Sequence, residues 1–264
     1  NTCYRIVERA MEALGARGRV VIEIEKRLPV QGGLGGASGN AVAALLGLEI
    51  ALKKRLSLAD ELRIAGEVGS DLPLFLIGGT VLGTGRGEEV YPLPDLPAVH
   101  CVVALPKISV STPQAFADWD LGMSGGDARP SVETAELTGS DPSDRMNEFS
   151  RRISAWLSSA SGVPVGKGRV RAETPLLDLV RTGIGNDFEK VVFPKYPELR
   201  EVKSVLERAG AFYASLSGSG SAVYGLFESK KKAETGAAAL TKIGTPATVT
   251  STLARPQYWK KMSD

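Results

Sequence analysis

The sequence predicts an α+β fold in two layers, and three observations lead to this prediction. Segments with apolar residues at helical spacing alternate with segments typical of strands. The alternation lacks the regular strand–helix–strand repeat of a parallel α/β sheet. With 264 residues, of which 43% are hydrophobic and 23% charged, the chain can form a substantial core in one large or two ordinary domains.

The first three segments alternate between helix and strand. Apolar residues at helical spacing predict a helix over residues 2–15, which stops at Gly15. Apolar and charged residues alternate over residues 18–28 and predict a half-buried strand. An Ala/Leu/Ile-rich face predicts a long helix from about residue 37 to residue 54.

The middle of the chain continues this pattern and then changes texture. Ser57, with Asp60 three residues later, has the spacing of a capping box and predicts the start of a helix. Residues 74–93 predict two short strands joined by glycine turns, and residues 98–106 predict a buried strand. Residues 120–175 are polar and rich in Gly, Ser, Asp and Pro, so we expect a mobile insertion there.

The last third returns to regular elements. Residues 174–210 predict helix in pieces, interrupted at Pro194 and Pro197. The segments that follow predict, in chain order, a strand–loop–strand unit, a helix and a last strand over residues 211–227, 229–244 and 246–256.

Charge and composition exclude several classes of function. The net charge is +2 and no basic stripe is interleaved with aromatic residues, so we expect no nucleic-acid partner. Cys3 and Cys101 lie far apart, which argues against a disulfide framework or zinc site and fits a reducing cytoplasm. His100 lies in an apolar run and is interpreted as a structural strand residue. No apolar stretch reaches the roughly 18 residues that span a membrane, so we expect no membrane partner.

Five glycines between residues 29 and 40 separate the predicted strand from the long helix. The start of a helix presents unpaired N–H groups and a partial positive charge, and glycines let an anion approach that backbone closely. Ser38 and Asn40 add polar side chains, so the pattern predicts a phosphate site rather than only a tight turn. The stretch fits neither GxxxxGK[ST] nor GxGxxG, because Ser38 stands where the latter requires its last glycine.

The glycine stretch, "PVQGGLGGASGNAVAALLGL", resembles the phosphate-binding motif of the GHMP kinases, which phosphorylate small molecules such as galactose, homoserine and mevalonate. Within this family it is most similar to the members that act on a diphosphocytidyl methylerythritol. The resemblance implies ATP and Mg²⁺ as cofactors. It also implies that the nucleotide contacts Pro29, Gly32, Gly33, Leu34, Gly35, Gly36, Ala37, Ser38 and Asn40.

A second segment, "VGSDLPLFLIGGTVLGTGRGEEVYPL", is similar to the family motif that carries the catalytic carboxylate. The matching residue is Asp71. A carboxylate near the attacking hydroxyl accepts its proton or orients it, which phosphoryl transfer requires. Without the resemblance, Asp71 would be interpreted as a turn aspartate at a helix boundary.

Two further segments resemble the family's substrate-binding parts. "ALPKISVSTPQAFADWD" is similar to a motif whose aromatic residue stacks on cytosine, which implies this role for Phe116 with Thr112 near it. The alternative is a core phenylalanine. "LSGSGSAVYGLF" matches a glycine-rich loop of the family that faces the phosphates, which implies that Gly218, Ser219 and Gly220 bind the substrate. The alternative is that Gly218 and Gly220 only form the turn of a β-hairpin. "GNDFE", residues 185–189, also matches the family.

The resemblance implies two domains and one reaction. Residues 1–97 would form an ATP-binding domain like ribosomal protein S5 domain 2, and residues 98–264 a ferredoxin-like domain carrying the insertion, with ATP in the cleft between them. The reaction would be ATP-dependent phosphorylation of the 2-hydroxyl of the cytidine diphosphate conjugate in the non-mevalonate isoprenoid pathway. We expect a monomer or homodimer in the cytoplasm.

The opening of the chain leaves alternatives. The family begins with strands that carry a lysine motif and a histidine motif, and neither occurs here. We therefore expect a fragment that lacks the first strands, the catalytic lysine and one wall of the cytidine pocket, or else a truncated paralogue. Two other functions stay open: a GHMP kinase for homoserine or a mevalonate phosphate, and a non-catalytic nucleotide-binding relative.

Overall fold

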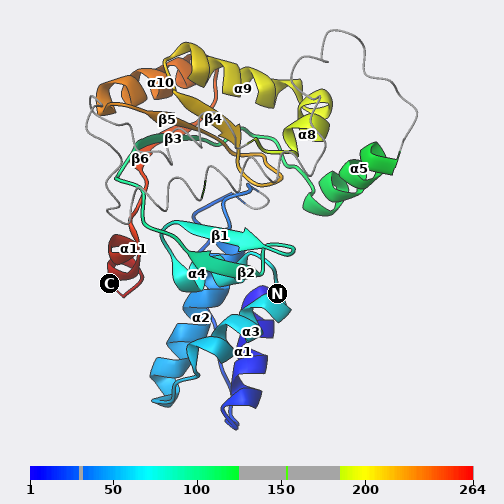
Figure 1. Cartoon of the computed structure of the whole chain (residues 1–264), viewed down its shortest axis with the longest axis vertical. Coiled ribbons are helices and arrows are strands. Elements are labelled where there is room, and N and C mark those ends of the chain that lie inside the picture. The colour runs from blue at the N-terminus through cyan, green and yellow to red at the C-terminus, as the bar shows by residue number, and fades with distance from the viewer. Residues whose placement is uncertain (30–31, 125–152, 154–184, 264) are drawn as a thin grey trace. The chain divides into compact units, whose positions relative to one another are not determined.

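The computed structural model describes residues 1–29, 32–124, 153 and 185–263. It contains both helices and antiparallel sheet and confirms the predicted α+β class. The chain divides into two compact units. Figure 1 colours the chain by residue number, from blue at the N-terminus to red at the C-terminus. The first comprises Asn1–Ala98 together with Thr252–Asp264, and the second comprises Val99–Ser251. Most of the predicted insertion at residues 120–175 lies outside the described residues.

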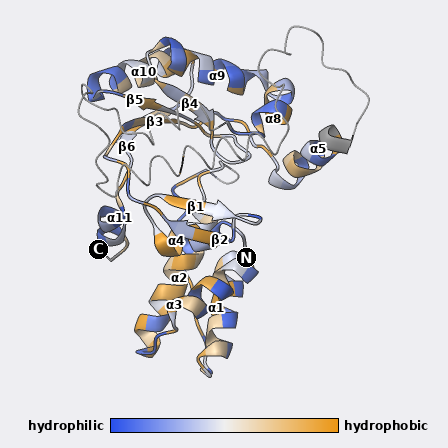
Figure 2. Cartoon of the chain, in the orientation of Figure 1, coloured by the Kyte–Doolittle hydropathy of each residue, from blue (hydrophilic) through white to orange (hydrophobic). Residues whose placement is uncertain are grey.

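Helices dominate the first unit. It contains α1 (Thr2–Ala13), α2 (Gly36–Leu52), α3 (Leu58–Val68) and α4 (Leu72–Ile77), followed by the antiparallel strands β1 (Val81–Thr84) and β2 (Glu89–Pro92). The helices bury one apolar core, to which α2 contributes Ala41, Val42 and Leu45, all fully buried. Figure 2 shows the hydrophobic residues concentrated along α2 and α4.

The capping prediction for α3 is confirmed. The backbone N–H of Asp60 donates to Oγ of Ser57 at 3.1 Å, and this hydroxyl donates to the Asp60 carboxylate at 2.7 Å. Ser57 therefore satisfies one of the helix's unpaired N–H groups.

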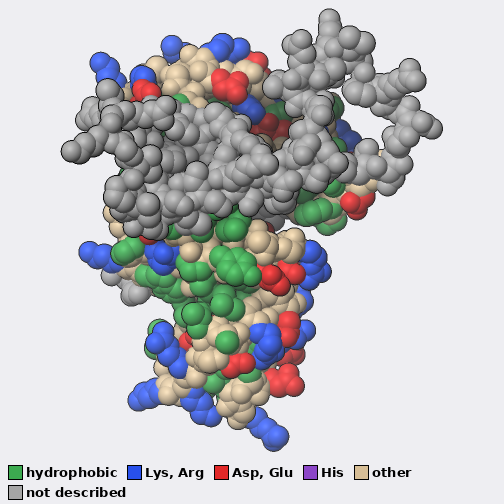
Figure 3. Space-filling model, viewed as in Figure 1, with side chains coloured by type: hydrophobic (Ala, Val, Ile, Leu, Met, Phe, Trp, Pro, Cys, Tyr) green, Lys and Arg blue, Asp and Glu red, His purple; other side chains and the backbone are tan. Residues whose placement is uncertain are grey.

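The prediction of a strand over residues 18–28 is wrong, because the backbone of this segment forms no strand. A strand requires hydrogen-bonded neighbours, and the first unit's described sheet contains only β1 and β2. The segment's apolar residues are consequently exposed: Val21 is 70% exposed and Leu28 is 50% exposed. Figure 3 shows further hydrophobic side chains gathered over β1, β2 and α4, where Leu74 and Tyr91 are exposed.

A C-terminal helix that the sequence did not predict, α11 (Arg255–Ser263), belongs to the first unit. Arg255 donates from Nε to the Gly78 carbonyl at 3.0 Å and from Nη2 to the Thr80 carbonyl at 2.9 Å. The Tyr258 hydroxyl donates to the Phe75 carbonyl at 2.7 Å. These bonds satisfy carbonyls at and beyond the end of α4. Residues 252–264 therefore cluster with the first unit, whereas the predicted second domain, residues 98–264, included them.

Replacing Arg255 by alanine is expected to destabilise the first unit by about 2 kcal/mol, because the Gly78 and Thr80 carbonyls lose a charged donor. Thermal unfolding followed by circular dichroism should show a fall in Tm of roughly 4–8 °C. Lys260→Ala is the control, since Lys260 is exposed on the same helix. Equal Tm values for the two variants would contradict a structural role for the Arg255 bonds.

In its described residues, the second unit contains a four-stranded antiparallel sheet with helices packed on one face. Its strands are β3 (His100–Ala104), β4 (Tyr213–Leu216), β5 (Val223–Phe227) and β6 (Ala247–Ser251), in the spatial order β4-β5-β3-β6. The chain passes from β3 through α8 (Glu189–Lys195) and α9 (Pro197–Arg208) to β4, and from β5 through α10 (Lys230–Lys242) to β6. This order and these two crossovers are the split βαβ arrangement of the predicted ferredoxin-like fold.

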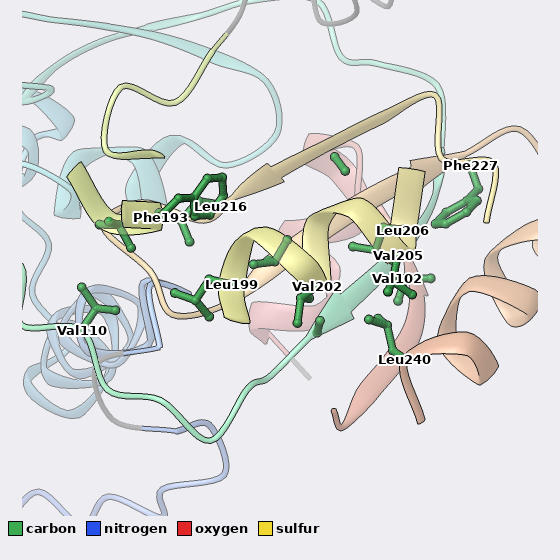
Figure 4. Close-up of a cluster of buried hydrophobic side chains, with 14 of the residues drawn as sticks. Val102, Val110, Phe193, Leu199, Val202, Val205, Leu206, Leu216, Phe227 and Leu240 are labelled. Carbon is green, nitrogen blue, oxygen red and sulfur yellow. The ribbon is translucent and has the colours of Figure 1, made fainter. Parts of the chain in front are cut away.

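The main core of this unit lies between the sheet and the helices α9 and α10. Alternate strand residues such as Val102 and Ala104 point to one face, as the two-residue period requires. Figure 4 shows Leu199, Val202 and Leu206 of α9 directed at this face. Pro194 lies inside α8, and Pro197 is the first residue of α9, so only the second proline begins a new helix.

Candidate functional site

The glycine stretch leads directly into α2. Gly33 and Gly35 have φ angles of +70° and +65°, and Gly35 is the N-cap of the helix. A glycine N-cap has no side chain to bond the first-turn N–H groups, so these remain oriented toward the loop. Ser38 is half-buried in this first turn, and the partial positive charge of the helix lies at the same end. The arrangement suits an anion.

The other predicted phosphate-loop residues are located around this turn. Pro29 is exposed at the entry to the stretch, and Gly32 is buried against it: a Cβ on Gly32 would lie 3.1 Å from Cγ of Pro29. Ala37 and Asn40 are exposed on the first turns of α2. Gly33, Leu34, Gly35 and Gly36 are half-buried, as Ser38 is.

Asp71 belongs to the helix that packs against this loop. It is the exposed N-cap of α4 and makes no side-chain capping bond. One turn further, the Phe75 ring occupies the space beside Gly35, where a Cβ would lie 2.4 Å from Cζ of Phe75. The same ring lies 3.6 Å from the Cβ position of Gly39. The helix that carries Asp71 and the helix that begins at the glycine stretch are therefore in direct contact within one unit.

In the second unit, two predicted substrate residues that are distant in sequence meet. The hydroxyls of Thr112 and Ser219 lie 2.8 Å apart in a hydrogen bond. Ser219 is buried, whereas Gly218 beside it is exposed with φ of +56°. Gly220 is buried, and its Cβ position would lie 3.1 Å from Leu216. The glycine-rich turn between β4 and β5 and the start of α5 (Thr112–Ser124) thus form one surface.

Phe116 lies on the same helix as Thr112 and is 53% exposed. The core position on this turn is taken by Ala115, which is buried, so the alternative of a core phenylalanine does not hold. The Phe116 ring contacts the Phe188 ring edge to face, with 4.9 Å between the centroids. One face of an aromatic ring is therefore available on the surface formed by Thr112 and Ser219.

The sequence interpretation gave no role to the polar residues of "GNDFE". In the structure, Asn186 and Glu189 hydrogen-bond β4 and the turn that follows it. The match to a family motif marked the segment, but its partners are more than 25 residues away along the chain, so no local pattern could identify them.

Among the described residues, neither the two cysteines nor His100 forms a competing centre. Cys3 and Cys101 are both free and buried, and burial raises the pKa of the Cys101 thiol to about 11, which keeps it protonated. His100 begins β3, as the structural interpretation predicted. Within the described ranges, no three His, Cys, Asp or Glu side chains are grouped as metal ligands. No helix in that part of the chain combines the length and apolar character that crossing a bilayer requires.

Comparison with known proteins places the chain beside the GHMP kinases. Residues 1–79 match the GHMP kinases N terminal domain, and residues 173–245 match the GHMP kinases C terminal domain. The chain is 38% identical over 230 residues to a 4-diphosphocytidyl-2-C-methyl-D-erythritol kinase from Solibacter usitatus, covering 87% of this chain and 63% of the relative. It is 33% identical over 235 residues to the enzyme of that name from Acaryochloris marina, covering 89% and 69%.

Solved structures of this family are similar to the chain as well. A crystal structure of 4-(cytidine 5'-diphospho)-2C-methyl-D-erythritol kinase is 31% identical, with a TM-score of 0.63 over 95% of this chain and 77% of that one. Homoserine kinase from Cytophaga hutchinsonii has a TM-score of 0.70 over 98% and 77%, at 20% identity. The second similarity shows the fold alone.

Proposed function

Since the chain belongs to the GHMP kinase family, in the branch of the 4-diphosphocytidyl-2-C-methyl-D-erythritol kinases, we propose that the protein phosphorylates the 2-hydroxyl of 4-diphosphocytidyl-2-C-methyl-D-erythritol with ATP. The observation that carries the proposal is the packing of Phe75 on Gly35, which brings the Asp71 helix into contact with the glycine stretch. A phosphoryl-transfer enzyme needs an anion site and a carboxylate near each other, and both belong to the first unit.

In this proposal the first unit binds the donor phosphates. ATP supplies the γ-phosphoryl group when bound. The backbone N–H groups from Gly32 to Ser38 donate to phosphate oxygens, and the glycines leave room for that close approach. Asp71 orients the 2-hydroxyl and accepts its proton as the oxygen attacks, which leaves a 2-phosphate ester and ADP. The exposure of Asp71 and its lack of a capping bond support this assignment, because the carboxylate is not committed to the fold.

Magnesium forms part of the proposal. Mg²⁺ in nucleotide sites is usually held by one or two protein oxygens together with phosphates and water, so a cluster of three protein ligands is not required. The Ser38 hydroxyl and the Asp71 carboxylate are the oxygen groups that this chain would supply. When bound, the ion would neutralise charge on the β- and γ-phosphates.

The second unit supplies the acceptor contacts in this proposal. The exposed face of Phe116 would stack on the cytosine ring, since aromatic rings stack on bases. Thr112 and Ser219 would form a polar edge beside it, together with the backbone of Gly218 and Gly220. Two buried free cysteines support a reducing cytoplasm as the location.

The test is phosphoryl transfer from ATP to 4-diphosphocytidyl-2-C-methyl-D-erythritol with magnesium present. The assay uses the 264-residue chain and, in parallel, any longer product of its reading frame. Formation of the 2-phosphate by either form supports the proposal. Transfer to homoserine or a mevalonate phosphate, and none to the cytidyl compound, would show that the proposed acceptor is wrong. ATP binding without any transfer would identify a non-catalytic relative.

A further inference from the structure

The side chain of Asn186 ties the strand end of β4 to the glycine-rich turn. Its Nδ2 donates to the Leu216 carbonyl at 2.8 Å and to the Gly218 carbonyl at 2.7 Å. Its Oδ1 accepts from the backbone N–H of Phe188 at 3.0 Å. Both N–H donors and the carbonyl oxygen of one carboxamide are thereby used, which fixes the side chain in one orientation.

Glu189 holds the same strand end from the other side of the backbone. Its Oε1 accepts from the Leu216 N–H at 2.9 Å and from the Ser215 hydroxyl at 3.0 Å. Its Oε2 accepts from Nζ of Lys203 at 2.6 Å, and the Glu189 side chain is only 17% exposed. Lys203 provides the countercharge that a partly buried carboxylate needs. The N–H and the C=O of Leu216 are therefore both bound by this one segment.

Phe188, between these two polar residues, supports the exposed aromatic ring. Its ring meets the Phe116 ring at an interplanar angle of 86°. Edge-to-face contacts of this kind stabilise the position of a ring beyond the area they bury. Residues 186–189 thus contact three parts of this unit: Asn186 bonds the turn, Asn186 and Glu189 bond the end of β4, and Phe188 contacts the Phe116 ring.

We propose that residues 186–189 are a positioning segment, which holds the turn at residues 217–221 and the Phe116 ring in the shape that the acceptor needs. This inference rests on the proposed function, because it assigns those two parts to the acceptor. A turn with glycines at 218 and 220 has large conformational freedom, so a ligand that orders it loses affinity. Bonds from Asn186 remove that freedom before the acceptor arrives. Asn186 and Glu189 do not touch the substrate in this arrangement.

The test is Asn186→Asp, which keeps the shape of the side chain but replaces two donors by a carboxylate facing two carbonyls. The KM for the cytidyl acceptor is expected to rise roughly tenfold, while the KM for ATP and kcat stay within about twofold. Gln114→Glu is the matched control: it makes the same amide-to-carboxylate change on α5, where the amide donates to Asp118 one turn away. The control should leave the acceptor KM within about twofold.

Hydrogen exchange separates this inference from the proposed function. Asn186→Asp should raise the exchange rates of the N–H groups between residues 216 and 221, whichever acceptor the enzyme uses. Unchanged exchange and unchanged acceptor KM would overturn the inference while leaving the function intact. Faster exchange in a protein whose wild type fails to phosphorylate the acceptor would overturn the function alone. Should the Asp variant not fold, Asn186→Ala gives the same comparison without the added charge.

Discussion

Asp71→Asn is expected to lower kcat by about 10²–10⁴-fold, because an amide cannot accept the proton of the attacking hydroxyl. The substitution keeps the size of the side chain, and Asp71 is exposed and makes no capping bond, so the Tm should not change by more than about 1 °C. Affinity for ATP should stay within about twofold. Steady-state kinetics, calorimetric titration with ATP and thermal unfolding measure the three quantities.

Asp60→Asn is the control for this variant. It makes the same chemical change in the same unit at a half-exposed residue, whose carboxylate bonds the Ser57 hydroxyl and Arg63 on α3. Its kcat should match that of the wild type. A kcat for Asp71→Asn within about threefold of the wild type would contradict the catalytic role. A parallel loss of kcat and Tm would mean instead that the residue supports the fold.

Gly35→Ala is expected to weaken both the first unit and its phosphate site. The residue has φ of +65°, which costs an alanine about 1–2 kcal/mol, and the added Cβ would lie 2.4 Å from Cζ of Phe75. The ring must move or the loop must shift, so the total loss of stability should be about 3 kcal/mol. Because the loop N–H groups move with it, ATP affinity should fall at least roughly tenfold.

Gly47→Ala provides a control within the same helix. Gly47 is an exposed interior residue of α2, and nothing lies within 4 Å of its Cβ position. Alanine there should stabilise the helix by about 0.5–1 kcal/mol and leave ATP affinity unchanged. Thermal unfolding and ATP titration of both variants complete the comparison. A Gly35→Ala protein with wild-type stability and affinity would show that the close contact with Phe75 does not shape the site.

Features that depend on neighbouring residues in the chain were predictable. The helix of residues 2–13 follows from apolar residues three and four apart, and the start of α3 follows from the Ser57 hydroxyl and the Asp60 N–H. The strands on either side of the turn at residues 217–221 are likewise where their pattern placed them. In each case the pattern that predicts the element lies within the segment itself, although distant partners complete its packing and pairing.

Features that depend on residues far away in the sequence could not be predicted. The alternation over residues 18–28 indicates one apolar face, but strand formation also requires a neighbour with free N–H and C=O groups, and the described sheet offers none to this segment. The role of Arg255 was invisible for the same reason, because its acceptors at Gly78 and Thr80 lie 177 and 175 residues away in sequence.

The sequence by itself determined the family, the α+β class, the glycine stretch at the start of α2 and the candidate residues Asp71, Phe116 and Ser219, since motif spacing and local conformation are properties of the chain. Only the tertiary structure decided that Phe75 lies on Gly35, that Thr112 bonds Ser219 across 107 residues, and that Asn186 holds the turn beside them. Such contacts form when separate apolar faces are buried together, and packing of that kind is not encoded in any single segment.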